Sequence, residues 1–198
     1  QTNGQPQWYT DATKTAVTNS VGDAERFLDD KSATPEFFGG FNTLLTYKGI
    51  SLSANFNYSY GNYILDDRAR GTLGDGRLTP RSTATWLFDN RWVPGKTDAL
   101  APQFRWGGQS GSREGANSRW LYDGSFIRLR DLTVAYKFPE QVTSVLSVNS
   151  LRVYFRGTNL LTFTKEDLYI DPEQAINGLY AGQTPALSTL SIGLDIQL

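Results

Sequence analysis

The 198-residue sequence contains no cysteine, no histidine and no methionine, and the first two absences each remove a class of chemistry. Without histidine there is no Ser–His–Asp relay and no imidazole general base. Without cysteine there is no thiol nucleophile, no disulfide framework and no cysteine-ligated zinc site. The 19 basic and 20 acidic residues balance to a net charge of -1, unlike the basic surface of a nucleic-acid-binding protein. We therefore expect a protein that is not an enzyme, has no catalytic residues and binds no nucleic acid.

Long hydrophobic runs are also missing. No stretch approaches the ~20 apolar residues that a membrane-spanning helix requires, and the N-terminal region lacks the apolar run of a signal peptide. The sequence begins at Gln1 rather than at a methionine, so we expect a processed product or, preferably, a fragment of a longer protein. Only helices and closed β-barrels satisfy every backbone group in lipid. A membrane protein with this sequence would therefore be a β-barrel.

The sequence is instead rich in alternating apolar and polar residues. From Ser191 to Leu198 every even-numbered residue is a large aliphatic one, and every odd-numbered residue is small or polar. A strand places these two sets on opposite faces. Four further segments alternate similarly: 41–47, 51–60, 126–138 and 151–156. In 126–138 the phase shifts by one residue near Asp131, which predicts a β-bulge. We predict five strands from these segments, and two weaker ones near Trp8–Lys14 and Glu25–Asp30.

The predicted connections between these strands alternate in length. Lys48–Ile50 is a tight turn, and Pro139–Asn149 is moderate, with a short helix expected at Gln141–Leu146. The other two connections, 64–121 and 165–185, are long. Outer-membrane barrels have short periplasmic turns and long outer loops. With the C-terminus in the periplasm, the two long connections are therefore predicted to be extracellular.

The pattern predicts an all-β fold, an antiparallel transmembrane β-barrel segment in the bacterial outer membrane, with one face on lipid and the other on a wet lumen. The predicted lipid-facing residues are Leu52, Phe56, Val153, Phe155, Ile192, Leu194, Ile196 and Leu198. The predicted lumen-facing residues are Asn55, Asn57, Arg152, Tyr154 and Arg156. Barrels of about eight strands have interiors filled by side chains. We therefore expect the rest of a functional barrel to come from elsewhere in the polypeptide.

Three alternatives remain open from the residues alone. A soluble β-sandwich that binds carbohydrate would alternate equally well along its strands. The long connection 64–121 argues against it, as do the aromatic residues that end the apolar faces, namely Tyr58, Tyr60, Tyr136 and Phe138. An outer-membrane enzyme barrel would need paired carboxylates, since there is no histidine. A barrel that serves secretion or adhesion would have the same pattern over these strands.

Several separated segments resemble the SusC/RagA family of TonB-dependent transporters, in the family's order and spacing. They are Pro35–Asn42 with Tyr47–Ser53, Ser118–Leu132, Leu151–Tyr154 with Asn159–Thr162, and Asp171–Glu173. The resemblance runs from about Pro35 to Leu198 and implies the last strands of a 22-stranded barrel. It also implies import of glycans or peptides across the outer membrane of Bacteroidota, driven by TonB through an N-terminal plug that this chain lacks. A SusD-like surface lipoprotein is the partner that the resemblance implies.

The long connection carries the aromatic and basic residues that we consider for contact with substrate or lipoprotein. Tryptophan faces stack on sugar rings, and arginine binds carboxylates bidentately. The candidates are Trp92, Trp106, Arg91 and Arg105, with Trp92 and Trp106 expected to be more exposed than Trp86. The alternative, which we favour for each tryptophan, is that Trp86, Trp92, Trp106 and Trp120 pack the connection into an ordered cap.

Other charged residues have a simpler explanation. Oxygen ligands for Ca²⁺ could come from two acidic groups, Asp66, Asp67 and Asp75 in one and Glu166, Asp167, Asp171 and Glu173 in the other. Neither has the EF-hand spacing, so we favour solvated charges and expect no cofactor and no metal. Gly95-Lys96-Thr97 is not a phosphate-binding loop, because Asn90 stands where that motif needs glycine. Arg152 and Arg156 would line the passage or, as we prefer, contact the plug.

Overall fold

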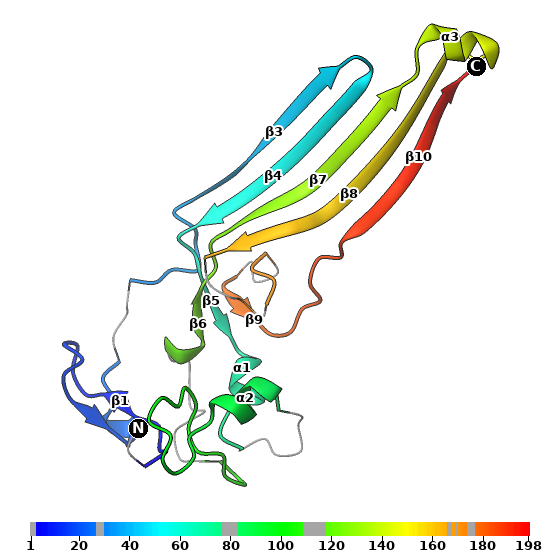
Figure 1. The fold of residues 1–198 in the computed structure, drawn as a ribbon. Coiled ribbons are helices and arrows are strands. Elements are labelled where there is room, and N and C mark those ends of the chain that lie inside the picture. The colour runs from blue at the N-terminus through cyan, green and yellow to red at the C-terminus, as the bar shows by residue number, and fades with distance from the viewer. Residues whose placement is uncertain are drawn as a thin grey trace. The chain divides into compact units, whose positions relative to one another are not determined.

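The computed structural model describes residues 3–26, 30–76, 83–108, 118–165, 168, 170–173 and 177–198 (Figure 1). The chain divides into two compact units. The first unit consists of residues 1–31, 65–122 and 179–182, and the second of 32–64, 123–178 and 183–198. No helix among the described residues is long and apolar enough to cross a membrane.

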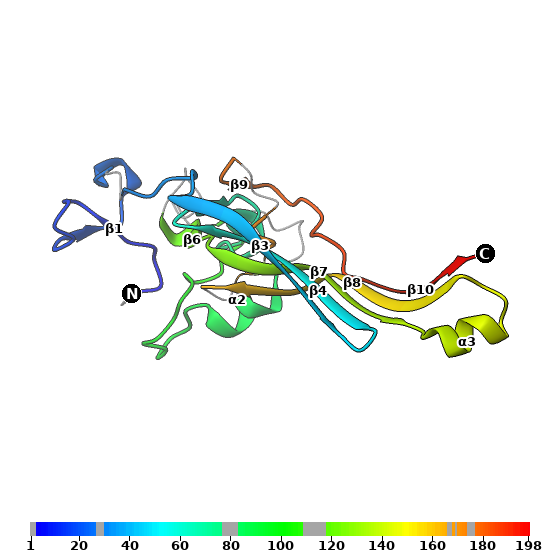
Figure 2. The same cartoon turned by 90° about the horizontal axis from the view of Figure 1, so that it is seen from above.

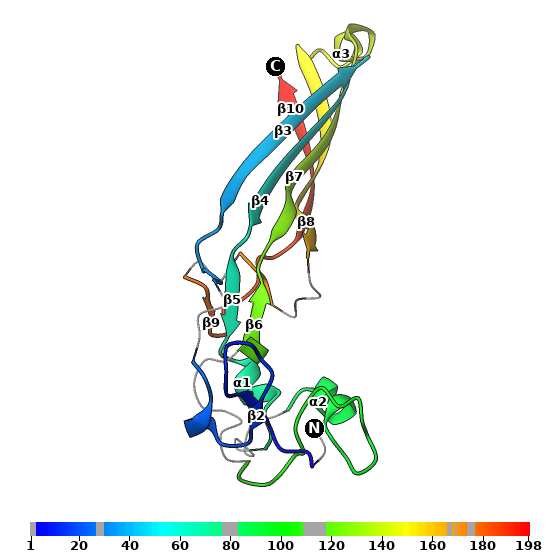
Figure 3. The same cartoon turned by 90° about the vertical axis from the view of Figure 1, so that its left-hand side faces the viewer.

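In the described part of the second unit, five long strands form one sheet, which we call the main sheet. The strands are β3 (Phe37–Tyr47), β4 (Ile50–Tyr60), β7 (Phe126–Lys137), β8 (Ser150–Thr164) and β10 (Thr189–Gln197). Their order is β10-β8-β7-β4-β3, and every neighbouring pair is antiparallel (Figure 1). The five strands predicted from alternation are confirmed. The sheet is a single curved layer (Figure 3).

The register of the main sheet collects the alternating apolar residues on one side, which we call the apolar face. One row crosses all five strands, and its members in order are Ile192, Phe155, Val134, Leu52 and Leu45. No neighbour in the described part of this unit buries the edges of the face, since Ile192 is 78% exposed. The apolar face is therefore an uncovered hydrophobic surface several strands wide, which in a soluble monomer would be unusual.

A β-bulge keeps both halves of β7 in phase with this face. The register shifts between Leu129 and Asp131, opposite Asn159 on β8, whose φ is 50°. Leu129 pairs with Phe56 and Leu132 pairs with Ala54, so the two leucines lie on the same face despite their odd spacing. The bulge predicted near Asp131 is therefore confirmed.

The short and long connections lie at opposite ends of the main sheet. The β3–β4 turn, helix α3 (Glu140–Val145) and the end of β10 share one end (Figures 1 and 2). Antiparallel pairing then puts the chain segments that follow β4 and β8 at the other end. The helix expected at 141–146 is confirmed within one residue at each end.

The first unit is built from short elements around a small core. They are β1 (Trp8–Tyr9), β2 (Val17–Thr18), η1 (Val21–Asp23), α1 (Ala69–Thr72), α2 (Thr85–Asn90), η2 (Ser118–Trp120) and β9 (Leu179–Tyr180). β5 (Tyr63–Asp66) and β6 (Leu121–Asp123) join β9 in a sheet of order β6-β5-β9, where β5 and β9 are parallel. The buried apolar side chains include Ala69, Leu87, Ala101 and Trp120. The connection 64–121 thus has a packed interior.

Of the two weaker strand predictions, the first is confirmed only at Trp8–Tyr9, and the second is wrong where the chain can be described. The strand expected at Trp8–Lys14 ends at Tyr9, because Asp11 organises a turn by accepting hydrogen bonds from the N–H groups of Thr15 and Ala16. These bonds, after a stronger one from the Thr13 hydroxyl, lower the pKa of Asp11 to about 2. Of the strand expected at Glu25–Asp30, residues 27–29 lie outside the described part and the others are not in a strand.

The β3–β4 turn supplies the first testable prediction. Lys48 and Gly49 both have positive φ, 46° and 87°, as a two-residue hairpin turn requires. A Cβ at Gly49 would stand 2.8 Å from the Lys137 carbonyl oxygen. We expect Gly49→Val to lower the free energy of unfolding of the purified protein by at least about 1–2 kcal/mol. Lys48→Gly is the control and should not destabilise, because glycine accepts the same φ. Equal losses in both variants would contradict this account of the turn.

Candidate functional site

The side of the main sheet opposite the apolar face, which we call the polar face, carries a ladder of charged and amide side chains. Arg152 donates to Asp195 on the neighbouring strand at 2.7 Å, and Arg156 donates to Asp131 at 2.5 Å. The five residues predicted to face a lumen all lie on this side: Asn55, Asn57, Arg152, Tyr154 and Arg156. That this face lines a lumen stays a prediction.

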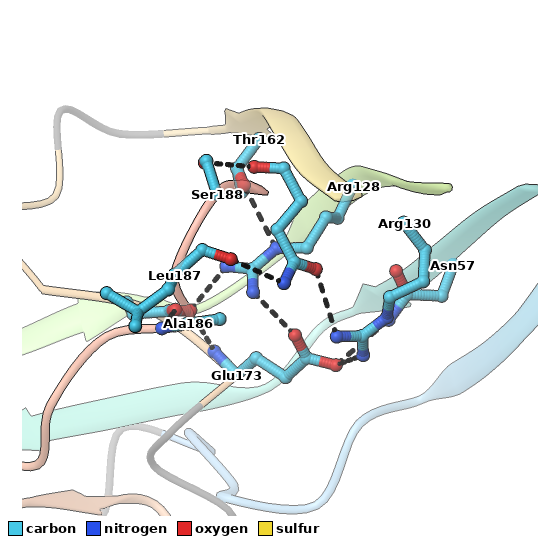
Figure 4. Close-up of polar contacts among 10 residues, drawn as sticks. Asn57, Arg128, Arg130, Thr162, Glu173, Ala186, Leu187 and Ser188 are labelled. Atoms are coloured by element: carbon cyan, nitrogen blue, oxygen red, sulfur yellow. Dashed lines mark hydrogen bonds and ion pairs between the residues drawn. The ribbon is translucent and has the colours of Figure 1, made fainter. Parts of the chain in front are cut away.

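At the polar face five side chains form a group that we call the arginine clasp: Asn57, Arg128, Arg130, Asp171 and Glu173. Arg128, on β7, uses all three guanidinium nitrogens (Figure 4). Its Nη2 donates to Asp171 at 2.5 Å, its Nη1 to Glu173 at 2.7 Å and its Nε to the Thr162 hydroxyl at 2.9 Å. The side chains of Arg128 and Asp171 are only 4% and 6% exposed.

Glu173 is held by further donors from the sheet. Arg130 forms an ion pair with its Oε1, and Asn57 Nδ2 donates to the same oxygen at 3.1 Å (Figure 4). Arg130 also donates to Asn159 Oδ1 at 3.2 Å. Asn57 and Arg128 are a cross-strand pair, and Arg130 is the extra residue at the bulge. The bulge therefore helps to gather the donors around one carboxylate.

The clasp attaches the chain between β8 and β10 to the polar face. We call residues 165–188 the last connection; the structure describes 165, 168, 170–173 and 177–188. Asp171 accepts from the backbone N–H groups of Glu173 at 3.0 Å and Ala186 at 2.9 Å. At the bulge, Asn159 Nδ2 donates to the Leu187 carbonyl, and the Ser188 hydroxyl donates to the Asn159 carbonyl. Both limbs of the last connection, 170–173 and 186–188, are thereby fixed to the sheet.

Burial and ion pairing act on the Asp171 carboxylate in opposite directions. Burial raises its pKa, but hydrogen bonds from Arg128 and from the Ala186 and Glu173 N–H groups together outweigh it and hold the pKa below the ordinary 3.8. A carboxyl whose pKa is lowered on folding contributes stability at neutral pH, and that contribution is lost as the pH falls below about 4. The attachment of the last connection should therefore weaken only in acid.

A second network joins the last connection to the chain that enters β7. Lys165 donates to Asp123 at 2.6 Å, and the Ser125 hydroxyl accepts from the Gly61 N–H. Asp123 is almost fully buried, which raises its pKa, but bonds from Lys165 and Ser125 outweigh the burial and lower the pKa overall. A Cβ at Gly124 would stand 2.5 Å from Asn62 Nδ2 and 2.8 Å from two side-chain carbons of Ile64, so a larger residue here would displace these side chains.

The four residues predicted to contact substrate or lipoprotein lie in the first unit. Trp106 is well exposed and thus more exposed than Trp86, as expected. Trp92 and Trp86 are both partly buried, and the expected difference between these two stays a prediction. Arg91 lies 3.7 Å above the Phe88 ring, and Arg105 donates to a glutamine. Within the described chain, no hydrogen bond or ring contact joins any two of Trp92, Trp106, Arg91 and Arg105. Their role in contacts stays a prediction.

Trp120 fits the packing alternative, because it is fully buried beneath the Arg119 guanidinium at 4.5 Å.

The acidic residues considered for calcium have other contacts here. Asp66 accepts from the Ala69 N–H at 2.9 Å, and its burial raises its pKa. Asp171 and Glu173 face the clasp arginines, and Glu166 and Asp167 lie outside the described residues. In the part of the chain that the structure describes, no three acidic side chains gather as a metal site would need. That the chain binds no metal stays a prediction, with calcium as the less favoured alternative.

The arginine clasp and the exposed Arg152–Asp195 pair allow a matched comparison. Asp171→Asn leaves Arg128 buried beside a neutral amide, so we expect the free energy of unfolding to fall by about 3–5 kcal/mol. Asp195→Asn removes a pair whose side chains are well exposed, and should cost about 0–1 kcal/mol. Hydrogen exchange at Ala186, whose N–H bonds to Asp171, gives a local reading. A loss at Asp171 no larger than at Asp195 would show that the clasp is not a structural anchor.

Comparison with known proteins identifies relatives of the chain in sequence and in structure. No model of a known protein family matches the chain. TonB-dependent receptor P3 of Formosa agariphila is 32% identical over 174 residues, which cover 83% of this chain and 16% of the relative. TonB-dependent receptor P26 of the same organism is 30% identical over 176 residues, with 83% and 17% covered. The chain thus spans about a sixth of the length of these relatives.

Solved structures of the RagAB peptide importer have the same fold over nearly the whole chain. Its 'closed-closed' state matches with a TM-score of 0.78 and 30% identity, over 98% of this chain and 21% of that one. Its 'open-open' state matches with a TM-score of 0.79 and 28% identity, over 99% and 21%. The sequence relatives and the structural relatives agree, and the chain therefore belongs to the TonB-dependent receptors, among the SusC/RagA-like members of that family.

Proposed function

We propose that the chain forms barrel wall and outer loops of a TonB-dependent outer-membrane importer of glycans or peptides that works with a SusD-like surface lipoprotein. The observation that carries this proposal is the main sheet, which has an uncovered apolar face and an opposite face with charged and amide side chains. A wall between lipid and a wet lumen needs both. The homology to TonB-dependent receptors supports the same reading.

In this proposal the apolar face meets the outer-membrane lipid. The lipid-facing residues are Leu52, Phe56, Val153, Phe155, Ile192, Leu194, Ile196 and Leu198. Aromatic rings lie at both ends of the apolar face, where an interfacial girdle would be. At one end Phe37 and Tyr60 stack at 4.7 Å, and at the other Tyr136 and Phe138 pack edge to face at 5.0 Å. Aromatic girdles at both edges of an apolar band are typical of strands that cross a bilayer.

The edges of the main sheet support a larger barrel. In the described residues β3 and β10 each have a neighbour on one side only, and they do not pair with one another. An open edge in lipid leaves backbone groups without hydrogen bonds. We propose that the remaining strands, of 22 in all, and a plug that TonB engages come from the rest of a longer polypeptide. The lumen-facing residues then include Asn55, Arg152, Tyr154 and Arg156, beside the clasp residue Asn57.

The long connections are the outer loops in this proposal, and their chemistry is binding. Residues 64–121 and 165–185 leave from the end of the sheet opposite the short turns. The exposed Trp106, with Trp92, Arg91 and Arg105, would contact the solute or the lipoprotein. The RagAB structures are of a peptide importer, which favours peptides among the candidate solutes. No residue here is proposed to catalyse a reaction.

Two adjacent positions on β4 test the wall directly. The chain has no cysteine, so spin labels can be attached singly at Leu52→Cys and Ser53→Cys in the full-length protein in bilayers, after replacement of any cysteines elsewhere. We expect the label at 52 to collide with oxygen dissolved in lipid and the label at 53 with a water-soluble nickel chelate, because the two side chains point to opposite faces. If both labels meet only the chelate, the membrane wall is wrong, and a soluble carbohydrate-binding sandwich becomes the better reading.

The partner is tested separately. Outer membranes extracted in mild detergent should yield the full-length polypeptide together with a surface lipoprotein, identified by intact mass spectrometry of the purified complex. The four-residue variant with Trp92, Trp106, Arg91 and Arg105 all changed to alanine should still reach the membrane but retain less lipoprotein or solute. Purification of the native polypeptide without any lipoprotein would contradict the proposed partner while leaving the wall intact.

A further inference from the structure

The two acidic residues of the arginine clasp are held in different ways. Asp171 and its partner Arg128 are buried, and two backbone N–H groups also hold the Asp171 carboxylate. Arg130 and Glu173 are 41% and 23% exposed, and no backbone hydrogen bond to the Glu173 carboxylate is seen among the described residues. The contacts of Asp171 with Arg128 therefore do not depend on the Glu173 carboxylate. Asp171 and Asn159 attach the connection to the sheet through contacts separate from those of the Glu173 carboxylate.

The donors around Glu173 belong to the sheet and not to the last connection. Asn57 comes from β4, and Arg128 and Arg130 come from β7 (Figure 4). Together they bind both carboxylate oxygens, Arg128 at Oε2 and Arg130 with Asn57 at Oε1, and the two arginine bonds are charge-assisted. Beside them Asn57 Oδ1 is buried and, among the described residues, has no hydrogen-bond donor. An N–H or O–H next to a bound carboxylate would satisfy that acceptor.

We propose that Asn57, Arg128 and Arg130 form a carboxylate-recognition site on the polar face, and that Glu173 occupies it as an exchangeable placeholder. The ligand is a solute that bears a carboxylate, either a peptide or a uronate-containing glycan. Such a solute displaces Glu173 from Arg130 while Asp171 keeps the last connection in place. This inference rests on the proposed function for its location, because the polar face must be the lumen wall for a transported solute to reach it.

Chemical rescue tests whether the site accepts a free carboxylate. In purified full-length Glu173→Ala protein no carboxylate of the chain fills the proposed site. Acetate should therefore raise the midpoint of thermal unfolding saturably, because a ligand that binds only the folded state stabilises it.

Chloride at equal ionic strength is the control for screening. Asp195→Ala, which vacates an exposed arginine on the same face, should show no saturable rise. The double variant Glu173→Ala, Arg130→Gln should also lose the response. No difference between acetate and chloride in Glu173→Ala would overturn the site.

A second measurement identifies the source of the carboxylate. Affinities of the wild-type importer are compared for trialanine and its C-terminal amide, and for a glucuronate-ended disaccharide and its neutral analogue. We expect one acid to bind at least about tenfold more tightly than its neutral partner, the equivalent of one hydrogen bond to a charged group. Arg130→Gln should abolish that preference. A preference that survives in Arg130→Gln, or no preference for either acid, overturns the recognition role.

The two proposals fail separately. Stabilisation by acetate is measured on the purified protein, so its result does not depend on where the protein lies in the cell. If the spin labels contradict the membrane wall but rescue succeeds, the carboxylate site stands without a role in transport.

Discussion

Antiparallel register assigns every side chain of the main sheet to one of two faces, and most of the structure depends on that assignment. A slip of one residue between two strands would move each apolar side chain to the polar face. The row that runs from Ile192 through Val134 to Leu45 exists only because four strand pairs keep the same phase. The bulge at Asp131 restores that phase in the middle of the sheet, since β7 changes its alternation there.

The same bulge has a second consequence on the polar face. Arg128, Arg130 and Asp131 all reach that face, so positive and negative charges are concentrated near one end of the sheet. Burying the Arg128 guanidinium costs free energy unless its N–H groups donate to acceptors and its charge is paired. Asp171, Glu173 and Thr162 meet them, and in doing so attach the last connection to the sheet. The Arg128 guanidinium therefore links the part of β7 next to the bulge to the last connection.

The clasp also refines the picture of a long outer loop. A connection of this length could project freely into solvent, but Asp171 binds Arg128 of the sheet and Asn159 of the sheet binds Leu187, so both limbs are attached to the polar face. In the proposed importer these limbs lie where a solute enters, and they carry the carboxylate that resembles the solute's own. In this proposal Asp171 anchors the segment and Glu173, two residues later, occupies the recognition site. The two roles differ because the ion pair of Asp171 with Arg128 is buried and that of Glu173 with Arg130 is partly exposed.

Period-two alternation is a local property, so the sequence by itself determined the five strands, the membership of each face and the bulge at Asp131. The short helix after Pro139 was also accessible from local pattern. The two-residue strands β2 and β9 were not, because they are too short to alternate, nor was the end of β1, where Asp11 forms side-chain bonds that no periodicity encodes.

The clasp was decided by tertiary structure alone. Its partners are 43 and 45 residues apart, and Arg128 in a strand with charged neighbours looks like any lumen residue until the last connection folds back to bury it. Burial, and with it the strength of an ion pair, depends on which distant segments pack together, and alternation along one strand carries no information about that.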